Sequence, residues 1–256
     1  MTPLPQAFLT QPLAHRGYHD AGHGVPENSR AACAAAVDAG YGIELDVQLS
    51  ADGHAMVFHD YDLDRMTPET GLVRAHTRAE LQHIPLLGGA EGIPTLREIL
   101  ALVAGRVPLL VEIKDQDGAM LRDVGPLEAA VARAVTDYDG PVAVMSFNPF
   151  AVEAVLHHAP DIPRGLTTCG YQPNDWPNLP PHVFEHLREV PHYDRLGVTF
   201  ISHRATDLNR PRIAELKKQG AHILCWTVRS AAQEAEARKV ADNITFEGYA
   251  PAHPGA

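Results

Sequence analysis

Short apolar, β-branched segments alternate with alanine-rich segments along the whole chain. The first kind predicts strands of a buried parallel sheet, and the second predicts the helices that connect them. The expected strands cover residues 12–16, 42–49, 108–114, 142–147, 163–168, 196–202, 222–228 and 243–248. The expected helices cover residues 28–39, 95–104, 126–138, 149–158, 181–189, 210–219 and 231–239.

Eight expected strands favour a (β/α)8 (TIM) barrel over an open doubly wound sheet. A doubly wound sheet usually carries a G-x-G-x-x-G loop after its first strand, and the sequence contains no such loop. The 256 residues also match the roughly 250 residues that such barrels commonly use. We therefore expect residues 1–256 to form a single barrel domain, with an insertion at about residues 50–95.

The apolar stretch at residues 56–60 predicts a hairpin rather than another barrel strand. Only Ser-Ala-Asp-Gly separates the preceding strand from it, which is too short for a parallel crossover. Centring the turn on Asp52 and Gly53 pairs residues whose numbers sum to 105, so that His59 stands opposite Asp46. A slip of one residue would set His59 toward Glu44's side of the ladder instead, and in either register the three groups lie close. The hairpin would thus deliver a histidine back to the rim of the barrel.

In barrels of this kind, the functional face is built from the carboxyl ends of the strands and the loops after them. The expected strands carry polar or aromatic residues near those ends: His15, Arg16, Glu44, Asp46, Glu112, Lys114, Ser146 and Trp226. Each one taken alone has an ordinary structural explanation, such as an ion pair, a helix cap or core packing. Their positions on successive strands indicate a common site.

Glu44 and Asp46 point the same way, because strand side chains alternate, with Cα atoms roughly 6.6–7 Å apart. Burying such a pair is costly without a proton, a basic partner or a metal. Glu112 adds a third carboxylate from the neighbouring strand. Three oxygen donors without cysteine favour one hard divalent cation, Mg²⁺ or Ca²⁺, over zinc. The alternative is a salt-bridged pair on a solvated edge strand.

Charge and cysteine content narrow the partners and the compartment. The net charge of −11 argues against nucleic acid or an anionic membrane as the main partner, so we expect a small-molecule ligand and no stable membrane association. The three cysteines are odd in number and show no C-x-x-C spacing, which fits a reducing compartment. Neither a signal peptide nor a membrane span is recognised, and we expect a cytoplasmic protein.

The motifs together resemble those of the glycerophosphodiester phosphodiesterase family. The shared fragments, in that family's order and approximate spacing, are AHRG (14–17), PENS (26–29), IELDVQLSADG (43–53), VFHD (57–60), VEIK (111–114), MSF (145–147), PRGL (163–166) and CWTV (225–228). The resemblance extends from about residue 12 to residue 250. It implies metal-dependent hydrolysis of glycerophosphodiesters to sn-glycerol 3-phosphate and an alcohol.

The resemblance also implies catalytic and metal-binding roles for matching residues. Glu44, Asp46 and Glu112 correspond to the family's ligands of a divalent metal. His15 corresponds to its general base and His59 to its general acid. The nucleophile is either water or the substrate's own glycerol hydroxyl, which would give a cyclic intermediate.

Further matching residues correspond to substrate contacts. Arg16 corresponds to a contact with the phosphate and is grouped with the catalytic residues. Glu27, Asn28 and Lys114 match polar positions near the phosphate and the metal, and Trp226 matches an aromatic position on the glycerol side. Ser146 and Phe147 match a position behind these contacts.

Two features depart from the family's pattern. The loop after the AHRG fragment carries the additional residues His19 and His23, which we expect to be solvated. The last strand reads ITFEG where the family commonly has an aspartate-proline ending. Glu247 either replaces that aspartate or has no part in the site.

Two other functions compete with this interpretation. A lipid-acting relative, of the lysophospholipase D or phospholipase C type, should carry an exposed apolar rim, whereas residues 60–95 are mostly polar. A non-catalytic phosphodiester-binding relative would keep the pocket without turnover. The presence of both histidines and all three carboxylates argues against that second alternative.

Overall fold

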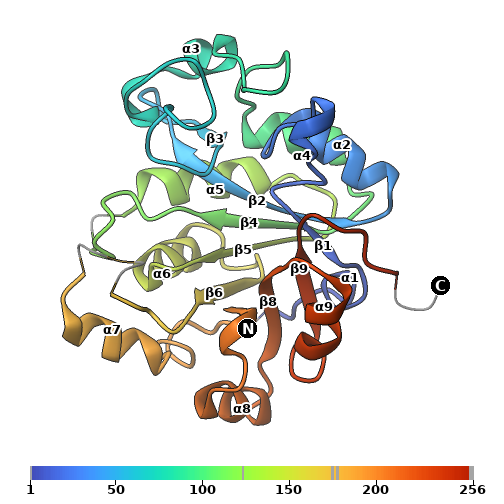
Figure 1. Ribbon diagram of the computed structural model, residues 1–256. Coiled ribbons are helices and arrows are strands. Elements are labelled where there is room, and N and C mark those ends of the chain that lie inside the picture. The colour runs from blue at the N-terminus through green and yellow to red at the C-terminus, as the bar shows by residue number, and fades with distance from the viewer. Residues whose placement is uncertain (1, 123, 174–175, 177–178, 254–256) are drawn as a thin grey trace.

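The computed structural model describes residues 2–122, 124–173, 176 and 179–253. Eight parallel strands in it close into a barrel, since β1 (Leu13–His15) pairs with both β2 (Gly42–Leu49) and the last strand. The remaining barrel strands, in sheet order, are β4 (Leu109–Ile113), β5 (Val142–Ser146), β6 (Arg164–Thr168), β7 (Phe200–Arg204), β8 (His222–Val228) and β9 (Asn243–Phe246). The predicted (β/α)8 barrel is confirmed (Figure 1).

In the described residues a helix lies at each of the seven expected positions outside the barrel (Figure 1). These are α2 (Arg30–Asp38), α4 (Leu96–Val103), α5 (Pro126–Val135), α6 (Pro149–His158), α7 (Pro181–Arg188), α8 (Pro211–Lys218) and α9 (Ala231–Ala237). Four of them begin with proline, whose missing N–H costs nothing at a helix start. None of the described helices has the length and apolar character needed to cross a bilayer.

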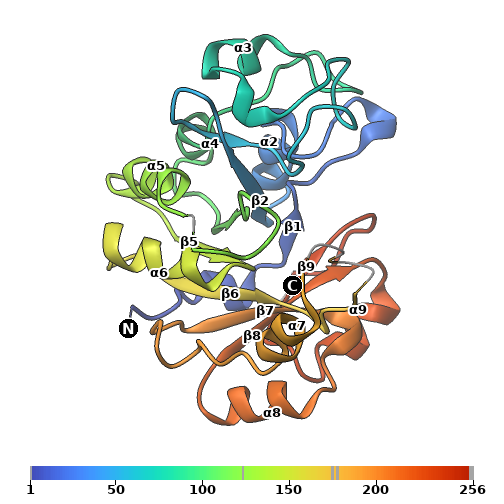
Figure 2. The same ribbon diagram turned by 90° about the vertical axis from the view of Figure 1, so that its left-hand side faces the viewer.

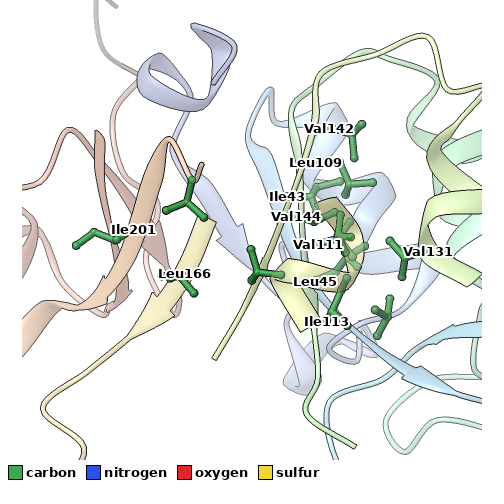
Figure 3. Close-up of a cluster of buried hydrophobic side chains, with 14 of the residues drawn as sticks. Ile43, Leu45, Leu109, Val111, Ile113, Val131, Val142, Val144, Leu166 and Ile201 are labelled. Atoms are coloured by element: carbon green, nitrogen blue, oxygen red, sulfur yellow. The ribbon is translucent and has the colours of Figure 1, made fainter. Parts of the chain in front are cut away.

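The outward faces of the strands pack against the helices. Ile43, Leu45 and Val111 are fully buried there and contact the same hydrophobic cluster as Val131 of α5 (Figure 3). Burying one such side chain stabilises the fold by about 1.5–3 kcal/mol. This layer uses the odd-numbered residues of β2, so that its even-numbered residues point into the barrel.

The amino-terminal end of the barrel is closed by apolar side chains. A short helix, α1 (Ala7–Thr10), brings Phe8 against the interior residues Leu110 and Phe200. Gly165 leaves room for the ring of Phe200, because a Cβ atom there would lie 2.3 Å from that ring. With this end filled, the polar interior positions lie toward the carboxyl end.

One predicted strand is displaced. Residues 196–202 were expected to be extended, but β7 begins at Phe200 and continues to Arg204. Leu196 and Val198 are buried, yet Leu196 lies in a turn and Val198 directly follows it. In this turn Gly197 has a φ of 57° and donates to the carbonyl of Asp194. The apolar alternation therefore begins before the true start of the strand, and the shift places Arg204 at the carboxyl end of β7.

The hairpin exists, but its predicted register is wrong by one residue. β3 (Ala55–Val57) pairs antiparallel with β2 so that residue numbers sum to 104, as in Val47 with Val57. Phe58 rather than His59 stands opposite Asp46, whose carbonyl accepts from the Phe58 N–H. The cause is a three-residue loop that ends on Gly53 at a φ of 80°, which is a common hairpin geometry.

Residues 58–95 lie on one side of the barrel, next to α2 and α4, and carry a small core of their own (Figure 2). The segment contains α3 (Arg78–His83), which the sequence did not predict, and the 3-10 helix Val73–Ala75. Two further 3-10 helices lie outside the segment in the described residues, at Ala21–His23 and Ala205–Asp207. Arg30 of α2 anchors the segment, because its guanidinium donates to Glu91 at 3.2 Å and to the carbonyl of Gly92 at 2.8 Å.

Candidate active site

A cavity of about 350 Å³ opens at the carboxyl end of the barrel. Eight of the predicted site residues line it: His15, Arg16, Glu44, Asp46, His59, Glu112, Lys114 and Trp226. They lie on β1, β2, β4 and β8, directly after β1 and β4, and in the loop after β3. The structure therefore brings together residues that are separated by up to 211 positions in the sequence.

Three carboxylates form the floor of this cavity. The strand register places His15 beside Glu44 and places Asp46 beside Glu112. One carboxylate oxygen from each of the three acidic residues lies within 4.8 Å of the others, and all three residues are buried. Such a cluster of oxygen donors matches the preference of Mg²⁺ and Ca²⁺.

The pKa shifts of the triad residues indicate whether the triad suits a cation. Burial, together with repulsion from Asp46 and Glu112, raises the pKa of Glu44 well above its usual range. Burial would also raise the pKa of Asp46, but Lys114, His59 and Arg16 together outweigh burial and hold that pKa well below its usual range. A negative charge on Glu44 is thus not compensated by Lys114 and Arg16. A hard divalent cation would compensate that charge, so the residues fit one.

Lys114 is more than a strand-end ion pair. Its Nζ atom lies 2.8 Å from Oδ1 of Asp46 and 2.6 Å from Oε1 of Glu112. Burial alone would lower the pKa of Lys114, but these two carboxylates raise it above its usual value. The side chain therefore stays charged within the cavity.

His15 is oriented by the segment that follows the last strand. Its Nδ1 atom lies 2.7 Å from Oε2 of Glu247, and its Nε2 atom lies 4.0 Å from Oε2 of Glu44. Burial lowers the pKa of His15, which favours the neutral imidazole. The hydrogen bond from His15 lowers the pKa of Glu247 to about 2. A neutral His15 therefore donates its Nδ1–H to Glu247 and leaves the Nε2 lone pair for a proton.

His59 is held by a carboxylate of the insertion, much as His15 is held by Glu247. Its Nδ1 atom lies 2.6 Å from Oδ1 of Asp60, and the carbonyl of His59 accepts from Gln48 at 3.0 Å. Arg65 donates from Nε to the other oxygen of Asp60 at 2.6 Å. Burial would raise the pKa of Asp60, but His59 and Arg65 outweigh burial and lower it. Asp60 therefore remains a carboxylate against the imidazole.

Arg16 and Asn28 connect the first loop to the triad. Both residues adopt a left-handed backbone with φ at 55°, and the Asn28 N–H donates to the carbonyl of Arg16 at 2.8 Å. The Arg16 guanidinium donates to Glu27 at 2.7 Å and lies 3.4 Å from Asp46. Asn28 donates from Nδ2 to Asp46 at 2.9 Å. Glu27 and Asn28 thus hold the side chains that line the cavity.

Of the remaining predicted residues, one lines the cavity and the others do not. Ser146 donates to the carbonyl of Ile113 at 2.7 Å and is buried beneath it, whereas Phe147 lines it. His23 is 84% exposed and pairs with Asp20. The loop that carries it does not line the cavity.

Several residues of the site were not predicted from sequence. Asp60, Arg65, Arg204 and Arg229 all line the cavity or bind its histidine partners. The Asp60 side chain could have been found from its place directly after His59. Arg204 was missed because its strand was expected to end at residue 202.

Comparisons with known proteins agree with this geometry. The protein-family model for the glycerophosphoryl diester phosphodiesterase family matches residues 15–243. The glycerophosphodiester phosphodiesterase of Caldanaerobacter subterraneus subsp. tengcongensis is 36% identical over 62% of this chain and 67% of its own length. YhdW of Bacillus subtilis is 31% identical over 85% of this chain and 86% of its own.

Solved structures show the same fold. An Oleispira antarctica phosphodiesterase in complex with the product sn-glycerol-3-phosphate aligns with a TM-score of 0.75 at 25% identity, over 94% of each chain. A glycerophosphodiester phosphodiesterase from Agrobacterium tumefaciens aligns with a TM-score of 0.68 at 25% identity, over 93% of this chain and 96% of its own. The chain belongs to the glycerophosphoryl diester phosphodiesterase family and is a phosphoric diester hydrolase.

Proposed function

We propose that this protein hydrolyses glycerophosphodiesters to sn-glycerol 3-phosphate and an alcohol, and that it uses one divalent cation, Mg²⁺ or Ca²⁺. The observation that carries the proposal is the buried triad of Glu44, Asp46 and Glu112 in the same cavity as His15 and His59. The product named for the Oleispira antarctica relative supports the glycerol 3-phosphate half of the substrate.

The three carboxylates would hold the cation. When bound, it would supply Lewis-acid stabilisation of the negative charge on the phosphate oxygens. Arg16 and Lys114 add fixed positive charge at the same place, since both line the cavity and both are held by Asp46. Charge that is positioned before the reaction is worth more in such a site than in water.

His15 would act as the general base. Its Nδ1–H donates to Glu247, which fixes the tautomer in which Nε2 accepts a proton. The proton comes from the nucleophile, either water or the glycerol hydroxyl, as its oxygen forms a bond to phosphorus. The neutral imidazole favoured by burial is the form that a base requires.

His59 would act as the general acid. As the bond from phosphorus to the alcohol oxygen breaks, the imidazolium of His59 gives its proton to that oxygen. Asp60 stabilises the imidazolium through the 2.6 Å contact with Nδ1. Trp226, which lines the same cavity, would contact the glycerol. Glu27 and Asn28 would support Arg16 and Asp46.

The test is an assay of the purified protein on a panel of glycerophosphodiesters, with and without a chelator. Release of sn-glycerol 3-phosphate that the chelator abolishes, and that Mg²⁺ or Ca²⁺ restores, is the expected result. Lysophosphatidylcholine belongs in the panel, because its preferred cleavage would instead indicate a lipid-acting enzyme. Binding of the diesters without turnover would indicate the non-catalytic relative.

We further propose that residues 1–256 act as one barrel domain with an insertion at about residues 50–95, and that the protein is cytoplasmic. The insertion supplies His59 and the Asp60–Arg65 support to the cavity, which favours one functional unit. The net charge of −11 supports a small-molecule substrate rather than nucleic acid or an anionic membrane.

A further inference from the structure

A second cavity of about 560 Å³ adjoins the first. The two share part of their lining, including His59, Phe147 and Trp226, whereas His15 lines only the first. His59 therefore stands at the border between them. If His59 protonates the leaving oxygen, the leaving alcohol lies next to His59, where the second cavity begins.

The residues that line only the second cavity are acidic, aromatic or uncharged. Three are aspartates, and among the described residues of this group none is basic: Gln48, Asp60, Tyr61, Asp62, Asp115, Met120 and Trp176. The first cavity, by contrast, is lined by several arginines. Glu112, Lys114 and Arg204 line both cavities, so the charge that belongs to the second cavity alone comes from its aspartates. This favours an anionic group in the first cavity and a cationic group beside the aspartates of the second.

Aromatic rings from separate segments meet at the second cavity. The ring of Phe147 lies 5.1 Å from that of Trp176 and 5.6 Å from that of Trp226, centroid to centroid. Tyr61 of the insertion also lines this cavity and is 42% exposed. Burial, with a contribution from Asp115, raises the pKa of Tyr61 to about 12, so its ring stays a neutral phenol.

The hydrogen-bonding capacity of the aspartates is partly used. Asp60 accepts from Arg65 and contacts His59, and Asp115 accepts from Asn148 at 2.7 Å. Asp62 lies exposed at the rim and supplies charge there. A cation without N–H donors needs this negative field and the ring faces, but needs no further acceptors. Quaternary ammonium groups are bound by aromatic rings in this way.

We propose that the second cavity binds the leaving alcohol and selects one that carries a quaternary ammonium group, such as choline. The inference rests on the proposed function, because it uses that reaction to place the alcohol. Tyr61, Phe147 and Trp176 supply the ring faces, and Asp62 supplies negative charge at the rim. The Trp226 ring is not counted among them, because the Arg204 guanidinium lies over it, 5.4 Å from the ring centroid.

The first experiment measures selectivity. Values of kcat/KM are determined for glycerophosphocholine, glycerophosphoethanolamine and glycerophosphoglycerol, and the choline diester is expected to be the best substrate. In Tyr61→Ser and in Asp62→Asn, the ratio of kcat/KM for the choline diester to that for the glycerol diester should fall roughly fivefold to thirtyfold. Leu72→Ser and Glu69→Gln are the matched controls, since both residues lie in the insertion outside the two cavities.

Two results overturn the assignment in that experiment. One is a ratio that stays the same in the two variants and in the wild-type protein. The other is a preference for the ethanolamine diester, which would assign the cavity to a hydrogen-bonding ammonium group rather than to a quaternary one.

The second experiment does not depend on turnover. Calorimetric titrations compare choline with 3,3-dimethylbutan-1-ol, its uncharged isostere, in the wild-type protein and in Tyr61→Ser. Choline should bind roughly tenfold more tightly than the isostere, and Tyr61→Ser should reduce the difference. Equal binding of the two probes overturns the inference. Failure to cleave any diester would overturn the proposed function instead, and the titration would still decide the inference.

Discussion

Nδ1 of His15 lies 2.7 Å from Oε2 of Glu247, which joins the first strand of the barrel to the segment after the last. The closure of the sheet between β1 and β9 is what brings these two residues together. His59 has an equivalent partner in Asp60, at 2.6 Å. Each histidine is therefore held at Nδ1 by a carboxylate that is in turn bound by an arginine, Arg229 or Arg65.

Replacing Glu247 tests whether it acts by positioning His15. Glu247→Ala removes the acceptor for Nδ1–H, and we expect kcat to fall roughly 10- to 100-fold, the usual cost of losing a group that orients a functional histidine, with KM changed little. Glu247→Gln keeps an acceptor oxygen and should recover part of the loss. Steady-state kinetics on both variants provides the measurement.

Glu236→Ala is the matched control, because that residue is 73% exposed and forms an ion pair with Lys239, away from the cavity. It should retain wild-type kinetics. If Glu247→Ala behaves like this control, Glu247 has no part in positioning His15.

Glu44 exposes a conflict between stability and metal binding. Burial and the neighbouring carboxylates raise its pKa, so the ionised form destabilises the metal-free protein. Glu44→Gln should leave metal-free stability unchanged or raise it by up to about 2 kcal/mol, while it abolishes the stabilisation by added Mg²⁺ or Ca²⁺. Thermal unfolding with and without each ion measures both effects. A metal-free Tm well below that of the wild type would contradict this account.

His59 is expected to act on protons rather than to bind the metal. His59→Ala should lower kcat by roughly 10²- to 10⁴-fold, as for loss of a general acid. Its affinity for the cation should remain close to that of the wild type, because Glu44, Asp46 and Glu112 are intact. Calorimetric titration with Mg²⁺ and Ca²⁺ decides the point. A large loss of affinity would make His59 a metal ligand.

The barrel could be predicted from the sequence because each of its strands and helices has a local pattern of apolar and polar residues. Each strand and each following helix carries its own pattern, and all seven expected helices occur within a few residues of their predicted bounds. The displaced strand at Phe200 shows where such evidence fails. Leu196 and Val198 are buried because the preceding turn packs against the core, and burial in a turn leaves the same apolar alternation as burial in a strand.

The candidate site, too, could be predicted from local patterns only in part. Glu44, Asp46 and Glu112 were predicted to converge because strand alternation and parallel register follow from the pattern. The pairing of His15 with Glu247 depends on the closure of the barrel, which joins residues 232 positions apart. The hairpin register depended on whether its loop held two or three residues, and Gly53 adopts the conformation that the longer loop requires.

His203 links stability to pH at a position away from the triad. It is 2% exposed at the end of β7, and its Nδ1 atom lies 2.7 Å from Oγ1 of Thr168. Within the described residues its Nε2 atom has no hydrogen-bond partner. Burial lowers the pKa of His203 from 6.5 to about 4, although Asp207 acts in the opposite direction. The imidazole is therefore neutral in the folded protein at pH 7.

Because the folded pKa lies below the unfolded one, the contribution of His203 to stability is complete above about pH 6.5. It is lost progressively as the pH falls toward 4, by up to about 3 kcal/mol, because the unfolded chain binds a proton that the folded chain excludes.

Carboxylates also titrate in this window, so the informative quantity is the difference between variants in how the free energy of unfolding changes with pH. Denaturant unfolding from pH 7 to pH 4 should give a shallower fall in the free energy of unfolding for His203→Gln than for the wild type, whatever its absolute stability. His23→Gln, at a position that is 84% exposed, should keep the wild-type slope. Equal slopes for His203→Gln and the wild type would mean that His203 is protonated equally in the folded and unfolded states.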